Sequence, residues 1–137
     1  MENWKGYVFS REINGSFIPQ RVQNAVIREY VKKQGNHFLL SAVEYYMDNC
    51  YMMLKSMVKE PETYDAVVFY SMHMLPTDDQ KRTELIETFL VQNKSMYFAL
   101  ENLSINSRDD VQLIQDIFLA KNLTDSNSLK KRLEAVF

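Results

Sequence analysis

Two apolar runs in this sequence end in side chains that could carry out chemistry. Ser10 and Arg11 follow a run near the N-terminus, and Ser71 and His73 follow a longer run in the middle of the chain. A histidine can transfer a proton near neutral pH, a serine hydroxyl can act as a nucleophile, and an arginine can bind phosphate or carboxylate through two parallel hydrogen bonds. These residue types predict a catalytic or anion-binding site where the two runs end.

Further polar residues complete this candidate site. Glu44 and Glu101 could supply a carboxylate for proton transfer or for binding sugar hydroxyls, and Tyr70 could stack on a sugar or a base. The predicted catalytic residues are His73, Glu44 and Ser10. The predicted ligand-binding residues are Arg11, Gln20, Gln23, Tyr70, Ser71, Glu101 and Asn102.

Each candidate also has a structural interpretation. His73 could be a hydrogen-bonded loop histidine, Ser10 and Arg11 could form a turn at a strand end, and a lone glutamate is often solvated surface. Cys50 lies near a predicted helix start, which would favour a reactive thiolate, and burial among neighbouring tyrosines is the alternative. The sequence has no Gly-rich phosphate loop, no H-E-x-x-H motif and no cysteine pair, so we expect no metal and no cofactor.

The elements that must position these side chains alternate between strand and helix. We expect strands at residues 5–10, 37–41, 66–69 and 95–100. Helices are expected to begin near Pro19, Asp48, Thr77 and Ser107, and a last short helix, residues 128–136, follows a break at residues 122–127. Alternation of this kind gives right-handed crossovers and a mainly parallel sheet. We therefore expect a three-layer α/β fold of four or five strands, and we take for it the commonest small strand order, 2-1-3-4.

Two helix starts and one apolar face are specific enough to check. Asp48 is expected to cap the second helix, and T-D-D-Q, beginning at Thr77, fits a capping box for the third. In the first helix, four-residue spacing predicts an apolar face of Val22, Val26 and Tyr30.

The strand order also predicts where the site lies. Ligands of such sheets bind outside the carboxyl ends of the strands, at the point where the strand order reverses. With the order 2-1-3-4 this crevice falls between the first and third strands. It would be lined by Ser10 and Arg11 on one side and by Ser71 and His73 on the other, with Glu44 and Glu101 at its flanks.

Composition limits the class of protein. The chain has 137 residues and a formal net charge of −2, without the basic excess that nucleic-acid binding usually needs. No apolar run reaches the 18 or so residues of a membrane span. We expect a single cytoplasmic domain over residues 1–137, with no nucleic-acid or membrane partner. Its C-terminal helices, at about residues 108–136, would support a homodimer.

Several segments resemble a known family, the sporadic carbohydrate cluster proteins. They are G-Y-V-F-S-R, I-P-Q-R-V-Q-N-A-V-I-R-E-Y, V-V-F-Y-S-M-H-M-L-P and F-A-L-E-N-L, and the resemblance runs from Gly6 to about Leu123. These are short bacterial proteins encoded among genes for surface polysaccharide and unusual sugar synthesis. The resemblance implies a role in carbohydrate biosynthesis without implying a particular reaction.

A fainter similarity is to the catalytic domain of resolvase-type serine recombinases. It rests on Gly6-Tyr7, on Gln23, on residues 72–77 and on Leu100-Glu101-Asn102. The similarity implies a resolvase-like topology. Strand exchange needs arginines around the phosphate that the serine attacks, and the family's two arginine positions after the third strand are Met74 and Thr77 here. In that family an arginine and a serine follow the Gly-Tyr pair. The corresponding positions here are occupied by Phe9 and Arg11, and Ser10 stands between them. A DNA recombinase is therefore not expected.

The sequence therefore predicts a protein that binds or transforms a sugar or nucleotide sugar at the carboxyl ends of the strands. The alternative is a non-catalytic interaction or scaffold module with a recombinase-like fold, which docks onto an enzyme of the same pathway. Its contact would be the Tyr- and Met-rich segment between Tyr45 and Met57. An exposed apolar patch there, together with a filled crevice, would favour the module over an enzyme.

Overall fold

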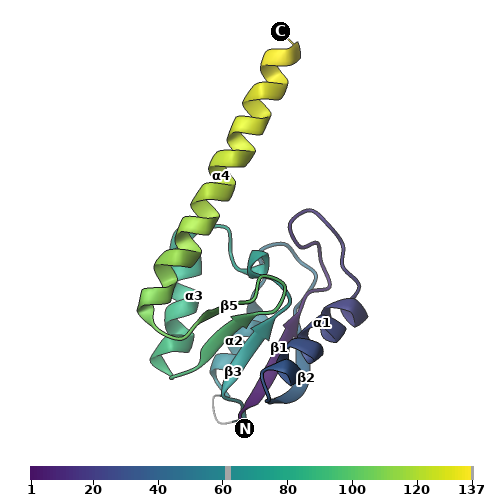
Figure 1. Ribbon diagram of the computed structural model, residues 1–137, viewed down its shortest axis with the longest axis vertical. Helices are drawn as coiled ribbons and strands as arrows, with labels where there is room; N and C mark the ends of the chain where they lie inside the picture. Colours follow the sequence, from purple (N-terminus) through teal and green to yellow (C-terminus); the bar gives the residue numbers. More distant parts are fainter. Residues whose placement is uncertain (61–62, 137) are drawn as a thin grey trace.

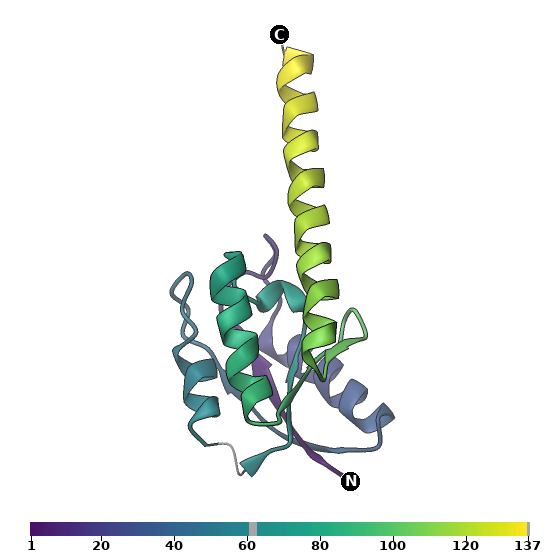
Figure 2. The same ribbon diagram turned by 90° about the vertical axis from the view of Figure 1, so that its left-hand side faces the viewer.

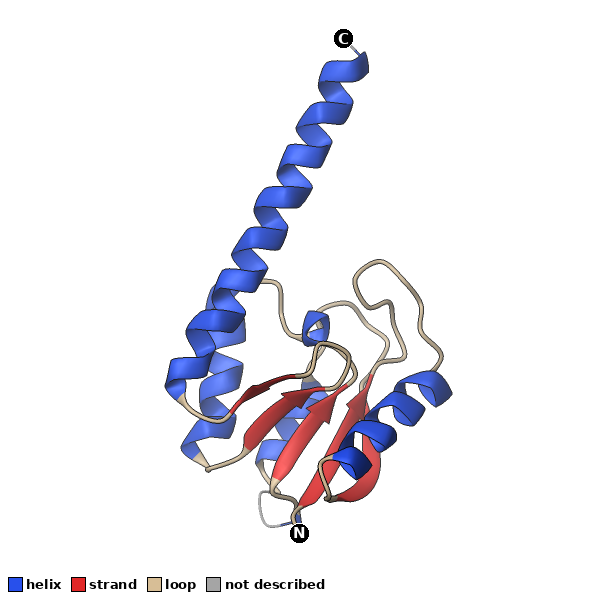
Figure 3. Ribbon diagram, in the orientation of Figure 1, coloured by secondary structure: helices blue, strands red, loops and turns tan. Residues whose placement is uncertain are grey.

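The computed structural model describes residues 1–60 and 63–136, with side chains described as far as residue 123. Its centre is a sheet of five strands in the order β2-β1-β3-β4-β5 (Figure 3). The strands are β1 (Asn3–Val8), β2 (His37–Val43), β3 (Ala66–Phe69), β4 (Ser95–Phe98) and β5 (Leu103–Ile105). The first four are parallel and β5 runs antiparallel to β4. The predicted order 2-1-3-4 is confirmed, with a fifth strand added at the β4 edge.

Helices cover both faces of this sheet (Figures 1 and 2). They are α1 (Gln20–Lys33), α2 (Met52–Val58), the 3-10 turn η2 (Met72–Met74), α3 (Asp79–Val91) and α4 (Arg108–Val136). One buried cluster joins α1 to one face of the sheet, and a larger one joins α2, α3 and the start of α4 to the other. This arrangement confirms the predicted three-layer α/β fold. Among residues 1–60 and 63–136, no helix is both long and apolar enough to cross a membrane.

Strand β3 is buried on both faces, as its apolar run predicts. Val67 and Phe69 face the cluster of α2, α3 and α4, while Ala66 and Val68 face the cluster of α1. The polar residues that follow β3 are thereby held at the carboxyl edge of a fully covered strand.

The buried face of α1 lies one residue away from the predicted one. The buried residues are Gln23, Ile27 and Val31, whereas Val22 is exposed. The prediction was wrong because one of the buried positions is the polar Gln23, so the buried face does not appear in the sequence as a continuous apolar repeat. Its side-chain amide bonds both the N–H and the carbonyl of Phe9, at 2.9 Å each, and so replaces an apolar contact with paired hydrogen bonds.

Three helix boundaries differ from the prediction. Helix α2 begins at Met52 rather than at Asp48, and α3 is capped by Asp78 rather than Thr77, since the Asp78 carboxylate accepts from the Lys81 N–H at 2.9 Å. The predicted break at residues 122–127 and the separate helix at 128–136 are also wrong. No Gly or Pro occurs within α4, so its weak helix formers do not end the helix. Figures 1 and 2 show its C-terminal half extending away from the sheet.

A buried arginine ties α3 to α4. Arg82 is fully buried, and its guanidinium donates to the carbonyls of Pro76 and Thr77, at 3.0 and 3.1 Å, and to the Gln115 side chain at 2.7 Å. It also pairs with Asp79 and lies 3.9 Å from the centroid of the Phe118 ring. These contacts fix the base of α4. The predicted homodimer and the single-domain boundary stay predictions.

Gly6 is required by the close approach of β1 and β2. A Cβ atom at this position would lie 2.0 Å from Ser41 Oγ and 3.1 Å from both Ser41 Cβ and Phe38 Cε1. We expect Gly6→Ala to lower the free energy of unfolding by about 1–3 kcal/mol, the usual cost of overpacking. Urea denaturation followed by circular dichroism measures this.

Ser41→Gly provides the control for this prediction. It removes the Ser41 Oγ and Cβ atoms that the new methyl group would meet and leaves only the contact with Phe38 Cε1, so the double variant should recover part of the loss in a double-mutant cycle. Strictly additive losses in the two variants would contradict the proposed clash.

Candidate functional site

The predicted crevice residues form two separate polar clusters at the carboxyl ends of the strands. One gathers around the carboxylate of Glu44, with Ser10 and Arg11, and the other around the carboxylate of Glu101, with Ser71 and His73. Among the described residues, no hydrogen bond joins one cluster to the other. The sequence therefore grouped correct neighbours within each cluster, but the structure does not show the single site that it predicted.

Glu44 is 1% exposed and caps helix α2. It stands just after β2, and its carboxylate oxygens accept backbone N–H groups from Met53 at 3.0 Å and Leu54 at 3.2 Å. It also accepts from the Tyr45 N–H at 3.0 Å and from the Tyr7 hydroxyl at 2.7 Å. The first N–H groups of a helix need such partners and favour negative charge.

This set of donors opposes a catalytic role for Glu44. Its oxygens are occupied and closed off from solvent, so a substrate proton has no path to them. Burial, and then the hydrogen bond to Glu44, raise the pKa of Tyr7 far above its ordinary value. Tyr7 therefore stays protonated as a donor. Tyr7 was noted only as part of the Gly6-Tyr7 pair that resembles the resolvase family, and its strand position carries no signal of this role as a donor to Glu44.

Ser10 and Arg11 hold the loop that follows Glu44. The Ser10 hydroxyl donates to the Glu44 carbonyl at 3.0 Å. Arg11 Nη1 donates to three loop carbonyls, those of Tyr45, Met47 and Cys50, at 3.0, 3.1 and 2.8 Å. Its guanidinium carbon lies 3.9 Å from the centroid of the Phe9 ring. Arg11 Nη1 is thus committed to its own chain and holds the guanidinium against the loop.

The two glutamines differ in position. Gln23 is fully buried and is occupied by Phe9 and by the Ile18 carbonyl, at 2.8 Å. Gln20 is the half-buried first residue of α1. Gln23 is therefore a structural residue rather than part of a ligand site.

The second cluster orders the turn after β3. Ser71 donates to Glu101 Oε2 at 2.7 Å and accepts from the His73 N–H at 3.1 Å, while the Met72 N–H donates to Glu101 Oε1 at 2.8 Å. Asn102 has a φ of 54° in the turn that leads from β4 into β5. Tyr70 is half-buried and packs against both core clusters.

His73 is the candidate that best retains the capacity for acid–base chemistry. Its ring centroid lies 5.9 Å from that of Phe118, and among the described residues its Nδ1 atom is buried without a hydrogen-bond partner. Burial, and then the charge of Lys121, lower the pKa of His73, while Glu101 acts in the opposite direction. The ring is therefore neutral near pH 7. Among the described residues, no group of three or more His, Cys, Asp or Glu could hold a metal ion.

The loop between Glu44 and α2 exposes an apolar surface, which we call the 45–52 patch. It consists of Tyr45, Tyr46, Met47 and Met52, of which Tyr46 is 75% exposed. Cys50, within the same loop, is half-buried and its Sγ lies 3.8 Å from Glu44 Oε2. An exposed apolar patch beside polar groups that bond to their own loop favours an interaction module over an enzyme.

A groove of about 650 Å³ lies between α2 and α3. The sequence carries no signal of this groove, because the lysines on its walls are indistinguishable from ordinary solvated positions of a helix. Lys55 stands on α2, Lys59 is the C-cap residue that follows the same helix, and Lys81 stands on α3.

Comparison with known proteins identifies structural neighbours only. No protein-family model matches the sequence, and the search of curated proteins finds no match. The N-terminal catalytic domain of TP901-1 integrase superposes with a TM-score of 0.64 at 13% identity, covering 90% of this chain and 97% of that one. A resolvase family site-specific recombinase from Streptococcus pneumoniae superposes with a TM-score of 0.61 at 5% identity, covering 96% and 95%.

These neighbours confirm the resolvase-like fold and correct the functional prediction. They agree with the fainter resemblance, while nothing supports the sporadic carbohydrate cluster family. The prediction of a sugar or nucleotide-sugar protein of carbohydrate biosynthesis is therefore wrong. The neighbours, an integrase and a site-specific recombinase, also overturn the exclusion of nucleic-acid partners and of DNA recombination.

We expect Glu44→Gln to lower the free energy of unfolding by about 2–3 kcal/mol. The amide cannot accept all the backbone and phenol donors that surround the carboxylate, and hydrogen bonds to a charged group contribute about 1.5–3 kcal/mol each. Urea denaturation is the measurement, and Glu12→Gln, at an exposed position, is the matched control. Equal stability of the two variants would show that Glu44 is not the cap described above.

We expect His73 to make stability depend on pH. Its folded pKa is lowered below the unfolded value of 6.5, so the unfolded chain binds more protons in this range. Stability should therefore fall as the pH drops through 6.5 toward the lowered pKa, and level off below it. Thermal melts of the wild type and of His73→Gln across this range should differ in slope, and parallel curves would contradict the assignment.

Proposed function

We propose that this chain acts in DNA recombination as a recombinase-fold module that joins a protein assembly and leaves strand cleavage to other subunits. The observation that carries the proposal is the set of hydrogen bonds by which Ser10 and Arg11 hold their own loop, beside the exposed 45–52 patch. The residues that would bind a ligand are used to hold the loop, and the loop presents apolar side chains outward. The cytoplasmic location predicted from the sequence fits this role and is part of the proposal.

The charges around Ser10 favour this role over cleavage. A serine that attacks a phosphate needs cations aimed at the developing charge. Arg11 Nη1 already donates to three carbonyls, and in the segment after β3 Met74 is fully buried in the apolar core. The resolvase likeness would place an arginine at that position, so the fold is retained without this part of the cleavage chemistry.

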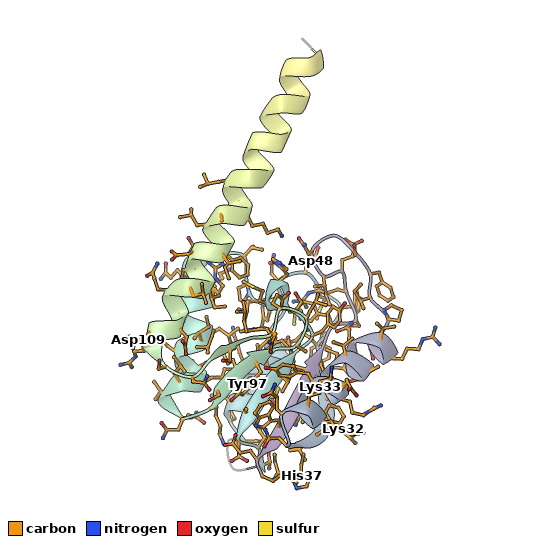
Figure 4. All side chains as sticks on the ribbon, in the orientation of Figure 1. Lys32, Lys33, His37, Asp48, Tyr97 and Asp109 are labelled. Atoms are coloured by element: carbon orange, nitrogen blue, oxygen red, sulfur yellow. The ribbon has the colours of Figure 1, made fainter. Side chains whose placement is uncertain are left out.

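Helix α1 offers a surface for DNA. Its exposed residues include four basic side chains and one acidic one, Glu29. The basic residues are Arg21, Arg28, Lys32 and Lys33. Figure 4 shows Lys32, Lys33 and His37 where α1 leads into β2. Clustered basic side chains bind the phosphate backbone and release its counterions.

Strand cleavage through Ser10 is the second candidate function. Ser10 follows β1 at the carboxyl edge of the sheet, and it is half-buried rather than sealed. If its hydroxyl leaves the Glu44 carbonyl, attack on a phosphodiester would join the protein covalently to one DNA end and release the other as a hydroxyl.

Binding and cleavage of duplex DNA distinguish these functions. We expect fluorescence anisotropy at low salt to show binding that weakens as salt is raised, with Lys32→Glu/Lys33→Glu reducing affinity about tenfold or more through lost phosphate contacts. Lys55→Glu/Lys59→Glu, on the other side of the sheet, is the matched control.

Denaturing gels then test for a covalent protein–DNA adduct, which we expect to be absent. An adduct that disappears in Ser10→Ala would establish the second candidate. No binding at low salt, or equal losses in the two lysine variants, would overturn the proposed contact with DNA.

A further inference from the structure

The groove between α2 and α3 has the size and lining of a ligand site. Its volume of about 650 Å³ falls within the range of small-molecule pockets. Tyr51, Val58, Pro76 and Leu85 supply apolar surface, and Pro76 and Leu85 are buried. The proposed function does not use this groove, although Asn49, Tyr51 and Lys55 of its lining fall within the segment between Tyr45 and Met57 that was predicted as a docking contact.

The groove lining carries an excess of positive charge. Lys55, Lys59 and Lys81 are exposed, and none of them has an ion pair within the part of the chain that the structure describes. The lining also holds two carboxylates, Asp78, which accepts from the Lys81 N–H at 2.9 Å, and Glu84, which accepts from Gln80 Nε2 at 3.2 Å. Three lysines against two carboxylates leave one formal positive charge in excess.

We infer that this groove binds an organic anion that has an apolar body and a carboxylate or phosphate group. The apolar body would cover the surface formed by Val58, Pro76 and Leu85, where burial of apolar area provides most of the affinity. The anionic group would lie among the lysine ammonium groups, which act as flexible point charges for carboxylate and phosphate.

The same groove reaches the base of the 45–52 patch. Tyr51 lines the groove, stands next to Met52, and donates its hydroxyl to the Met74 carbonyl at 2.8 Å. The Arg11 guanidinium, which holds the loop, lies 5.1 Å from the centroid of the Tyr51 ring. A bound anion therefore contacts the residue that joins α2 to this loop. If the bound anion also changes docking through the 45–52 patch, that effect rests on the proposed function. Binding of the anion to the groove does not rest on it.

Anilinonaphthalene sulfonate is a suitable probe, since it combines an aromatic body with an anionic group and fluoresces in apolar sites. We expect a saturable rise in fluorescence, with affinity reduced about tenfold in Lys55→Glu/Lys59→Glu and also reduced in Lys81→Glu. Lys32→Glu/Lys33→Glu on α1 is the matched control and should bind as the wild type does. All these lysines are exposed, and far-ultraviolet circular dichroism confirms that each variant is folded.

Competing ligands and a variant of the 45–52 patch test the chemistry and the position of the site. Dodecanoate should displace the probe and dodecanol should not, because only the former carries a charge, and phenyl phosphate tests the phosphate source. Tyr46→Ser/Met47→Ser removes apolar surface from the 45–52 patch and should leave probe binding intact. Loss of binding in that variant, or equal binding in the two lysine double variants, would overturn the groove site. Neither result would alter the DNA-binding comparison above, so the two proposals fail separately.

Discussion

The buried carboxylate of Glu44 is the constraint on which this edge of the protein depends. A charge removed from solvent is tolerated only when donors surround it, and here they come from β1, from the loop after β2 and from the first turn of α2. Satisfying one residue therefore fixes three segments relative to each other. Arg11 adds bonds to the next carbonyls of the same loop, so the strand ends are locked rather than open.

Locking the strand ends changes where the molecule can interact. In open α/β sheets the carboxyl ends of the strands usually form the ligand crevice. Here the polar groups that could bind a ligand bind the backbone instead, and the loop they hold turns Tyr45, Tyr46 and Met47 outward. The surfaces that we propose for interaction therefore lie around this edge rather than at its centre: the 45–52 patch, the groove between α2 and α3 and the basic surface of α1.

The fold was readable from the sequence because its signals are local. The apolar run of β3 and the alternation of strands and helices each follow from neighbouring residues, and they predicted the mainly parallel three-layer sheet. The order 2-1-3-4, taken as the commonest for small sheets of this kind, agrees with the structure. For the candidate site, the sequence predicted which residue types lie at the ends of the strands, but not what their side chains bind. Gln23 and Glu44 look the same in sequence whether they bind a ligand or a backbone, and only the tertiary fold, which buries both, decides between these roles. The buried face of α1 was misplaced for the same reason.

The exclusion of nucleic acid failed for a different physical reason. Net charge is a sum over the whole surface, whereas a phosphate backbone interacts with the charges within about 10 Å of it, the Debye length at moderate salt. Helix α1 has four basic residues and one acidic residue, while the first turn of α4 has Asp109 and Asp110. Figure 4 shows Asp109 on the opposite side of the view from Lys32 and Lys33. A formal net charge of −2 is thus compatible with a basic surface on one side of the sheet, which the net charge of the whole sequence does not reveal.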